Sequence, residues 1–215
     1  MFSKTILLFA ALLGSSIARP TLSVPDVAGA TKVCADVILA AAPNTAKCGS
    51  SVQFADECRT AEQAASFVTR SFIDYDIATA GEQAALLALM LYESGEFKYN
   101  QSHFPSHTEN KGTRNMQSAD FNRKYATDLF GADKVAQAGG LTDGILGLLS
   151  GEKESFASAA WFLTSQCDQS IRQGLQAGTQ AGWTNYLTKC VYTTDNAERD
   201  AYWTKAMTAL GALKN

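Results

Sequence analysis

The sequence predicts a mainly α-helical domain that is exported from the cell, and three observations support this. From residue 60 to residue 211, apolar residues recur at helical spacing in successive segments. Several of these segments open with a good N-cap residue. No segment shows convincing alternation of apolar and polar residues, apart from short possibilities within 96–117, so strands are not expected to dominate.

The first eighteen residues have the pattern of a secretory signal peptide. Lys4 provides the basic start, and Ile6–Leu13 is an apolar run of eight residues, which is too short to span a bilayer. Ser16 and Ala18 place small residues where a signal peptidase reads them. We therefore expect residues 1–18 to be removed, or slightly more if Arg19 is trimmed, and the mature protein to be extracellular.

Charge and composition exclude some classes of partner. The chain has 18 basic and 21 acidic residues, and loss of Lys4 with the leader leaves 17 against 21, a balance of −4. A nucleic-acid-binding protein needs a basic face, so this class is excluded. No segment after the leader is long and apolar enough for a membrane helix. We expect a monomer that uses no cofactor.

Two regions follow the leader. Residues 19–57 are rich in Ala, Ser, Val and Pro, with a weak helical stretch near 32–42 that ends at Pro43. This is a lead-in segment that we expect to pack on the main domain, residues 58–215.

The main domain is expected to consist of helices. Thr60 with Gln63 and Thr79 with Glu82 form capping boxes for helices over 60–73 and 79–93, and Gly95 is placed to end the second in the left-handed conformation. The further helices are expected near 118–130, 132–138, 142–150, 153–166, 168–176, 179–190 and 195–211, with Ser118, Thr142, Asp168 and Thr194 as caps.

The five cysteines indicate disulfides, because an exported chain meets oxidising conditions. Cys48 and Cys58 bracket a loop, while Cys167 and Cys190 lie near the ends of two expected helices. We predict the pairs Cys48–Cys58 and Cys167–Cys190 and leave Cys34 free, although spacing alone does not decide pairing. None of the spacings is typical of a zinc site, so no metal is expected.

Glu93 is the main candidate for chemistry. The nine residues Ala84–Tyr92 carry no charge, so every face of this helix is apolar and the helix is expected at the centre of the domain. Partial burial and the negative end of the helix dipole should both raise the pKa of Glu93, as a general acid requires. The alternative is that Glu93 only marks the point where the helix reaches water. Glu96 is a rival, but it lies past Gly95 and should be better solvated.

Residues 96–117 form a long loop, and loops of this length in compact domains are often functional. Tyr99 and Phe104 could stack on sugar rings or pack on the body of the protein. The sequon Asn100-Gln101-Ser102 predicts N-glycosylation at Asn100. His103 and His107 have Pro105 between them, so we interpret them as exposed loop residues instead of metal ligands.

Two motifs resemble known enzymes. Residues 93–97, ESGEF, resemble the E-S-x-x-F signature of lytic transglycosylases and goose-type lysozymes, and residues 112–117, GTRNMQ, resemble their G-x-x-G-x-M-Q block with Asn115 replacing a glycine. A third block is matched only loosely by Ala159-Ala160-Trp161-Phe162. The chain also resembles secreted fungal lysozyme-like proteins. The resemblance implies a lysozyme-like fold, with a central buried helix and a long loop that lines a groove.

What the resemblance implies is cleavage of a β-1,4-linked amino-sugar polymer, peptidoglycan first and chitin or chitosan second. Glu93 is then the catalytic acid, and Ser94, Met116 and Gln117, with Tyr99 and Phe104 of the loop, are the expected substrate-binding residues. Hydrolases usually use a second carboxylate, and no motif identifies it in this sequence. The candidates within reach of Glu93 by sequence are Glu96, Glu109 and Asp120.

Two other readings stay open. A non-catalytic cell-wall-binding protein or effector could keep the same fold, and the acidic balance and the unassigned second carboxylate favour it slightly. A chitosanase-like or chitinase-like hydrolase would share Glu93 and differ only in substrate. Under either enzyme reading, Glu93 should line the deepest groove within reach of Gln117.

Overall fold

The computed structural model describes residues 33–49 and 52–212, and all regular structure in these residues is helical. The predicted leader, residues 1–18, and the start of the lead-in segment lie outside the described residues. The expectation of a mainly α fold is confirmed. The helices are α1 (Ala35–Ala41), η1 (Pro43–Ala46), α2 (Ala61–Asp74), α3 (Ala80–Glu93), α4 (Ala119–Phe130), α5 (Ala132–Ala138), α6 (Gly144–Leu149), α7 (Glu152–Gln166), α8 (Gln169–Gln176), α9 (Gln180–Tyr186), η2 (Leu187–Val191) and α10 (Ala197–Ala209).

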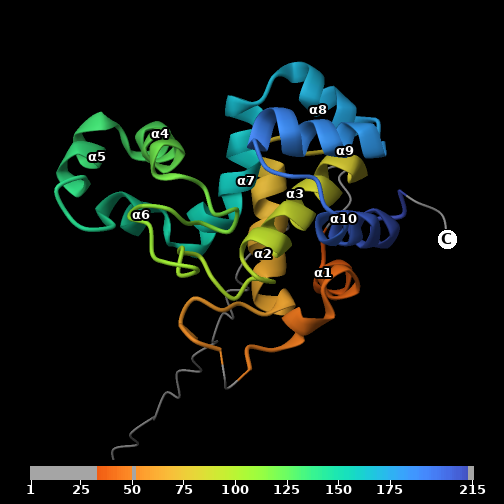
Figure 1. The fold of residues 1–215 in the computed structure, drawn as a ribbon, viewed down its shortest axis with the longest axis horizontal. Helices are drawn as coiled ribbons and strands as arrows, with labels where there is room; N and C mark the ends of the chain where they lie inside the picture. The colour runs from red at the N-terminus through yellow and green to blue at the C-terminus, as the bar shows by residue number, and fades with distance from the viewer. Residues whose placement is uncertain (1–32, 50–51, 213–215) are drawn as a thin grey trace, which may run out of the picture.

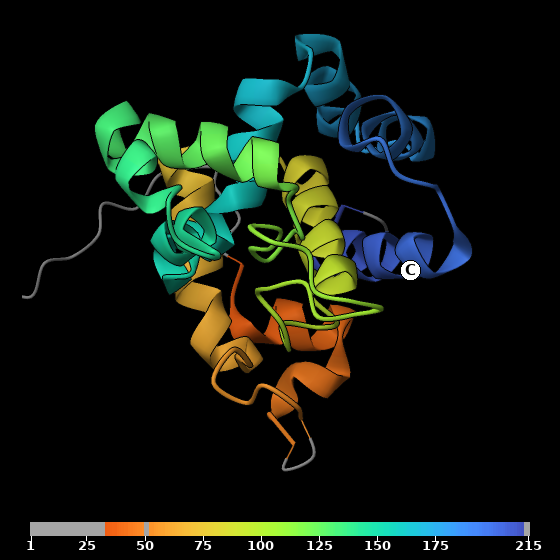
Figure 2. The ribbon, with the colours of Figure 1, turned by 60° about the vertical axis from the view of Figure 1, so that its left-hand side comes forward.

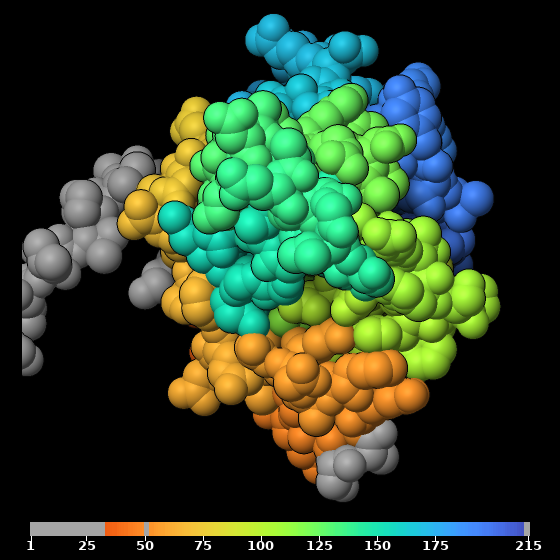
Figure 3. All heavy atoms as spheres, turned by 90° about the vertical axis from the view of Figure 1, so that its left-hand side faces the viewer, coloured from red at the N-terminus to blue at the C-terminus, as the bar shows by residue number. Residues whose placement is uncertain are grey.

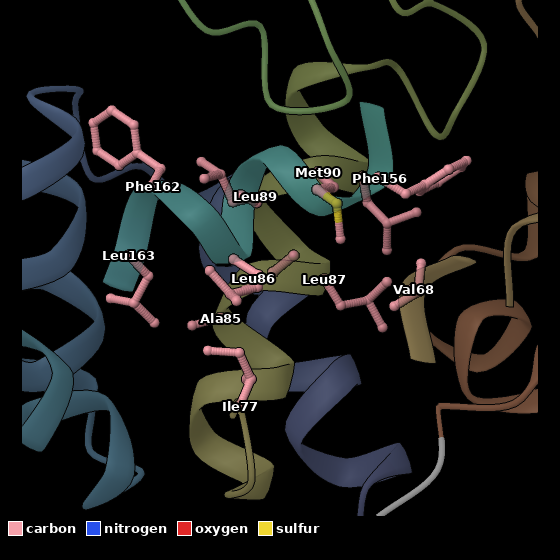
Figure 4. Packing of buried hydrophobic residues seen from close by; sticks show 14 of the residues in the cluster. Val68, Ile77, Ala85, Leu86, Leu87, Leu89, Met90, Phe156, Phe162 and Leu163 are labelled. Atoms are coloured by element: carbon pink, nitrogen blue, oxygen red, sulfur yellow. The ribbon is translucent and has the colours of Figure 1, made fainter. Parts of the chain in front are cut away.

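Helix α3 is the centre of the molecule (Figure 1). Every residue from Gly81 to Leu91 is buried, as expected for a helix that is apolar on all sides. Helices α7, α8 and α10 pack against it. In Figure 4, the side chains of Leu86, Leu87, Leu89 and Met90 of α3 lie among apolar side chains of α7, such as Phe156 and Leu163, and of α2, such as Val68. The core is therefore built around the helix that ends at Glu93.

Sequence predicted the starts of the two central helices better than those of the later ones. Both capping boxes form, Thr60 with Gln63 and Thr79 with Glu82. The N-caps predicted at Thr142 and Thr194 are wrong. The N-cap of α6 is Asp143, one residue after Thr142, and the N-cap of α10 lies two residues after Thr194. At α10 the cap is Asn196, whose side chain accepts two backbone N–H groups of the first turn. Asn and Thr are both good caps, so sequence alone did not separate them.

Helices α4, α5 and α6 form a separate group on one side of the molecule, and α7 joins this group to the rest (Figure 1). The 96–117 segment runs between the end of α3 and this group (Figure 2). The three tryptophans, Trp161, Trp183 and Trp203, are all buried, which confirms their interpretation as core residues.

The cysteine pairing is confirmed. Cys48 is bonded to Cys58 and Cys167 to Cys190, and Cys34 is free. The first bond crosses the predicted boundary at residue 58, and α1 of the lead-in segment packs on α2 and α10. Two such bonds indicate an extracellular or otherwise oxidising environment. In the part of the chain that the structure describes, no helix has both the length and the apolar character to cross a bilayer.

Candidate active site

Glu93 is the last residue of α3, and a tight terminator follows it. Gly95 adopts φ +59°, the left-handed conformation that the sequence predicted. Its N–H group bonds the carbonyl of Tyr92, and the N–H group of Glu96 bonds the carbonyl of Leu91 at 2.7 Å. These two bonds form the Schellman pattern, which stops a helix abruptly. The carboxyl group of Glu93 is thus delivered at the edge of the core.

Arg199 of α10 holds one oxygen of this carboxylate. Its Nη2 donates to Oε1 of Glu93 at 2.6 Å, and the side chains of Glu93 and Arg199 are 20% and 5% exposed. Within the described residues no hydrogen bond reaches Oε2 of Glu93. One oxygen is therefore anchored inside the protein, and the other is left for solvent or a ligand.

The guanidinium of Arg199 is itself fixed in place. Its Cζ lies 3.9 Å from the centroid of the Tyr92 ring, a cation–π contact. Nη2 also donates to Oγ1 of Thr193 at 3.1 Å. Nε and Nη1 are buried without a partner among the described residues. Because burial of unpaired donors is costly, this arrangement requires an explanation beyond packing alone.

The ion pair changes the expected electrostatics of Glu93. The sequence offered only burial and the helix dipole, and both favour a neutral carboxyl group. The structure adds a guanidinium in contact with the carboxyl group, and it comes from a residue 106 positions away. No local signal in the sequence marks Arg199 as part of this site.

Tyr186, which is buried, and Tyr202, which is partly buried, lie near the two glutamates. Burial, and next the negative charge of Glu93, raise the pKa of Tyr186 far above its ordinary value, so this phenol stays neutral. Burial also raises the pKa of Tyr202, reinforced by its hydrogen bond to Glu96. Both residues therefore contribute neutral surfaces to the site.

Glu96 lies in the turn that follows α3, and like Glu93 it is bonded by a side chain of α10. Tyr202 of α10 donates to Oε1 of Glu96 at 2.9 Å, and Oε2 of Glu96 is buried without a partner in the described residues. Arg199 and Tyr202 are three positions apart, one turn of α10, so α10 engages both carboxylates. Glu96 and Phe97 both have positive φ, 61° and 64°. The other candidates for a second carboxylate, Glu109 and Asp120, are exposed.

Glu57 organises the beginning of the 96–117 loop. Its Oε2 accepts the N–H groups of Asn100 and Gln101, at 2.8 and 3.2 Å. Its Oε1 lies 2.7 Å from Nε2 of His103. Glu57 directly precedes Cys58, so the first disulfide and the loop are fastened together at this residue. No motif in the sequence points to Glu57.

Arg114 holds the same loop from inside the protein. It is fully buried, and it donates to the carbonyls of Phe97, Tyr99 and Glu57. Burial lowers the pKa of Arg114 to about 10, and the charge of Glu152 partly opposes this effect. The sequence shows that Arg114 lies inside the GTRNMQ motif. Nothing in the motif indicates that its side chain holds the loop.

The motif residues Ser94, Met116 and Gln117 are used mainly within the protein. Ser94 is buried, and its Oγ donates to the carbonyl of Met90 and accepts the N–H group of Phe97. The amide of Gln117 is buried and bonds two asparagine side chains, Asn115 and Asn122. Met116 is partly buried, with φ +49°. No hydrogen bond joins Glu93 to Gln117 in the described residues, so their substrate contacts stay a prediction.

Tyr99 and Phe104 belong to an aromatic cluster with Phe54 and His103. The rings of Phe54 and His103 stack with centroids 3.6 Å apart, and Tyr99 meets Phe104 edge to face. Phe104 is 61% exposed, and Tyr99 is partly buried. A Cβ atom at Gly95 would lie 3.5 Å from the Tyr99 ring, so Tyr99 lies against the turn that ends α3.

Figure 3 shows the face on which the 52–60 segment (orange), the 96–117 loop (yellow-green) and α5–α6 (green to teal) meet. His107 pairs with Asp143, with 3.0 Å between Nε2 and Oδ2. Both histidines therefore have carboxylate partners. Among the described residues, no three His, Cys, Asp or Glu side chains are grouped so that they could hold a metal ion.

A pocket of about 390 Å³ lies away from Glu93. It is lined mainly by polar residues from the end of α7, from α8 and from the link before α3, and Glu93 is not among them. Arg172 and Gln176 of this lining also bond Glu82 in α3. The pocket is therefore attached to the opposite end of the central helix.

Asn100 of the sequon is only 8% exposed. Its Nδ2, the atom to which an N-linked glycan is attached, donates to the carbonyl of Ser150 at 3.3 Å. A glycan at this atom requires that this hydrogen bond is broken, and glycosylation stays a prediction.

The comparisons with known proteins give one partial similarity. No protein-family model matches the chain. Over 157 residues, 69% of this chain, it is 37% identical to a bifunctional dioxygenase (DOX)-epoxy alcohol synthase (EAS) of Fusarium oxysporum (strain Fo5176). The chain spans only 12% of the length of that relative.

Proposed function

We propose that this chain is a secreted, lysozyme-like, glycan-cleaving domain that acts on a β-1,4-linked amino-sugar polymer, with peptidoglycan as the first substrate to test. The observation that carries the proposal is the geometry of Glu93. Its carboxyl group lies at the end of a helix that is buried from Gly81 to Leu91, with Oε1 anchored to Arg199 and Oε2 open. A general acid needs this combination of fixed position and one accessible oxygen.

The proposed chemistry uses Glu93 as the acid. Oε2–H of protonated Glu93 gives its proton to the glycosidic oxygen, the bond between that oxygen and the anomeric carbon breaks, and its electron pair stays on the leaving oxygen. The positively charged anomeric carbon is then captured by water, or by a hydroxyl of the same sugar chain, and the attacking oxygen gives its proton to Oε2 of the Glu93 carboxylate, which regenerates the acid. The first outcome is hydrolysis, and the second is transglycosylation.

The aromatic cluster supports a sugar ligand. Phe104 and Phe54 present exposed ring surface, and Tyr99 lies between Phe104 and the turn that follows Glu93. Aromatic rings offer flat apolar faces on which pyranose rings pack. The loop that carries Tyr99 and Phe104 is held by Glu57 and Arg114, so it is positioned before a ligand arrives.

The relative from Fusarium oxysporum fits the proposal if the matched segment is a separate module. We infer that it is a separate module, because the matched segment covers 69% of this chain but only 12% of the length of the relative. The described residues of this chain pack around a single core cluster. Expression of the matched segment of the relative alone tests the inference, which predicts a folded product with cooperative unfolding.

The decisive experiment compares wild-type protein with Glu93→Gln on purified peptidoglycan, chitin and chitosan. We expect wild type to release soluble fragments from at least one polymer and Glu93→Gln to release none, while circular dichroism shows both proteins folded. Mass spectrometry of the products separates anhydro ends, which indicate transglycosylation, from reducing ends, which indicate hydrolysis. Wild-type protein without turnover on all three polymers would refute the enzyme proposal.

A non-catalytic cell-wall-binding protein is the second candidate. It is favoured by the internal use of Ser94 and Gln117, whose polar groups bond the protein itself. Sedimentation with insoluble peptidoglycan or chitin distinguishes the two proposals. A binder is depleted from solution by the polymer but releases no fragments, and Phe104→Ala weakens its binding while Glu93→Gln does not.

A further inference from the structure

We propose that Arg199 is a positioning residue for Glu93, which selects the oxygen that delivers the proton and stabilises the charge left behind. This inference rests on the proposed function and adds a residue that the motifs do not contain. Arg199 comes from α10, far in sequence from both motif blocks, and it directly contacts the candidate acid.

The contact selects one oxygen. Nη2 of Arg199 is a donor without acceptor capacity, and it lies 2.6 Å from Oε1. When Glu93 is protonated, Oε1 must remain the accepting oxygen, so the proton resides on Oε2. Oε2 is also the oxygen that no described residue engages. Arg199 therefore aligns the O–H bond of the acid with the open side of the site.

The same contact acts on the charge of the transition state. As the proton leaves Oε2, the Glu93 carboxyl group acquires a full negative charge next to the guanidinium. The attraction is stronger at this position than in water, since Arg199 is 5% exposed. Stabilisation of a charge that appears only during the reaction raises kcat and leaves substrate binding unchanged.

The surroundings hold the guanidinium in position beside Glu93. The Tyr92 ring covers one face of it, and Thr193 accepts a second bond from Nη2. Nε and Nη1 stay buried without acceptors in the described residues. A guanidinium placed only to stabilise the fold would be expected to satisfy more of its five donors.

The test measures kcat and KM of Arg199→Ala and Arg199→Lys on the polymer that wild type degrades. Arg172→Ala is the matched control, because it removes the ion pair with Glu82 at the other end of the same helix. We expect Arg199→Ala to lose kcat by about 100-fold with KM little changed. Guanidinium chloride at millimolar concentration should restore most of the rate, because the free ion fits the space left beside Tyr92.

The outcomes separate the possible explanations. Normal kcat in Arg199→Ala overturns the inference and leaves the proposed function intact, whereas inactive wild-type protein overturns both. A slow Arg199→Ala that guanidinium does not rescue, with a loss of thermal stability equal to that of Arg172→Ala, assigns Arg199 a structural role and also overturns it. If Arg199→Ala fails to fold, Arg199→Lys decides: reduced kcat at unchanged KM supports the inference, and wild-type kcat contradicts it.

Discussion

Each end of α3 carries a glutamate that is paired with an arginine from the C-terminal half of the chain. At the beginning of the helix, Oε1 of Glu82 lies 2.6 Å from Nε of Arg172. At its end, Oε1 of Glu93 lies 2.6 Å from Nη2 of Arg199. The N–O distance is the same in both pairs, and both glutamates belong to the same helix. The two carboxylates differ in their exposure, in their number of hydrogen-bond partners and in their place along the helix.

The pair at the beginning of α3 is fully satisfied. Glu82 is 0% exposed, and its carboxylate also accepts bonds from Thr79 and Gln176. It lies in the first turn, where the helix dipole stabilises a negative charge. Both oxygens of Glu82 are therefore held by hydrogen bonds inside the protein, as expected for a structural residue.

The pair at the end of α3 is only partly satisfied. Within residues 33–49 and 52–212, Glu93 has one hydrogen-bond partner; it also has an open oxygen and a position at the end of the helix where the dipole opposes its charge. The difference teaches that an ion pair does not by itself define a role. The number of hydrogen-bond partners, the accessible oxygen and the place along the helix distinguish the two carboxylates.

The largest expected effect is on catalysis. Glu93→Gln should lower kcat by about 10²- to 10⁴-fold, since the amide cannot donate an acidic proton. Its amide oxygen can still accept the bond from Arg199, so stability should change little. Fragment release and urea denaturation measure the two quantities separately, and loss of both together would make Glu93 a structural residue like Glu82.

The second effect is on stability. Glu82→Gln should lower the free energy of unfolding by about 3 kcal/mol, because one partner of a buried ion pair is lost. The value is at the low end for such changes, since the Arg172 side chain is 26% exposed and can turn to water. Urea denaturation measures it. A drop in kcat of the folded enzyme would contradict the assignment of Glu82 to the fold.

The third effect probes the turn after Glu93. Gly95→Ala should cost about 1 kcal/mol, because the residue has φ +59°. It should also lower kcat, because alanine at this position shifts the turn that fixes Glu93. Thermal unfolding combined with fragment release tests both parts, and unchanged kcat would show that the position of Glu93 does not depend on this turn.

The smallest effect probes the opposite end of the same helix. Thr79→Ala removes the N-cap of α3 and should cost about 1 kcal/mol, similar to Gly95→Ala. Unlike Gly95→Ala, it should leave kcat at the wild-type value. Equal losses of stability with different effects on kcat would confirm that only one end of α3 serves the site, and equal effects on kcat would contradict it.

The predictable features were local ones. The capping box at Thr79, the apolar run that buries α3 and the left-handed Gly95 are each decided by residues within a few positions of one another. The pairing of Cys167 with Cys190 was also predicted correctly, helped by their places near two helix ends. Glu93 at the end of a buried helix follows from the same local rules.

By itself, then, the sequence determined the helical fold class, the central helix and the carboxylate at its end. Only the tertiary structure decided what surrounds that carboxylate: Arg199 beside Glu93, Tyr202 on Glu96, and Glu57 and Arg114 on the loop. These contacts join residues that are distant in the chain, and no rule of spacing or propensity specifies which distant side chains meet. The packing of α10 on α3 selects them, and with them the charge and the accessible oxygen of Glu93.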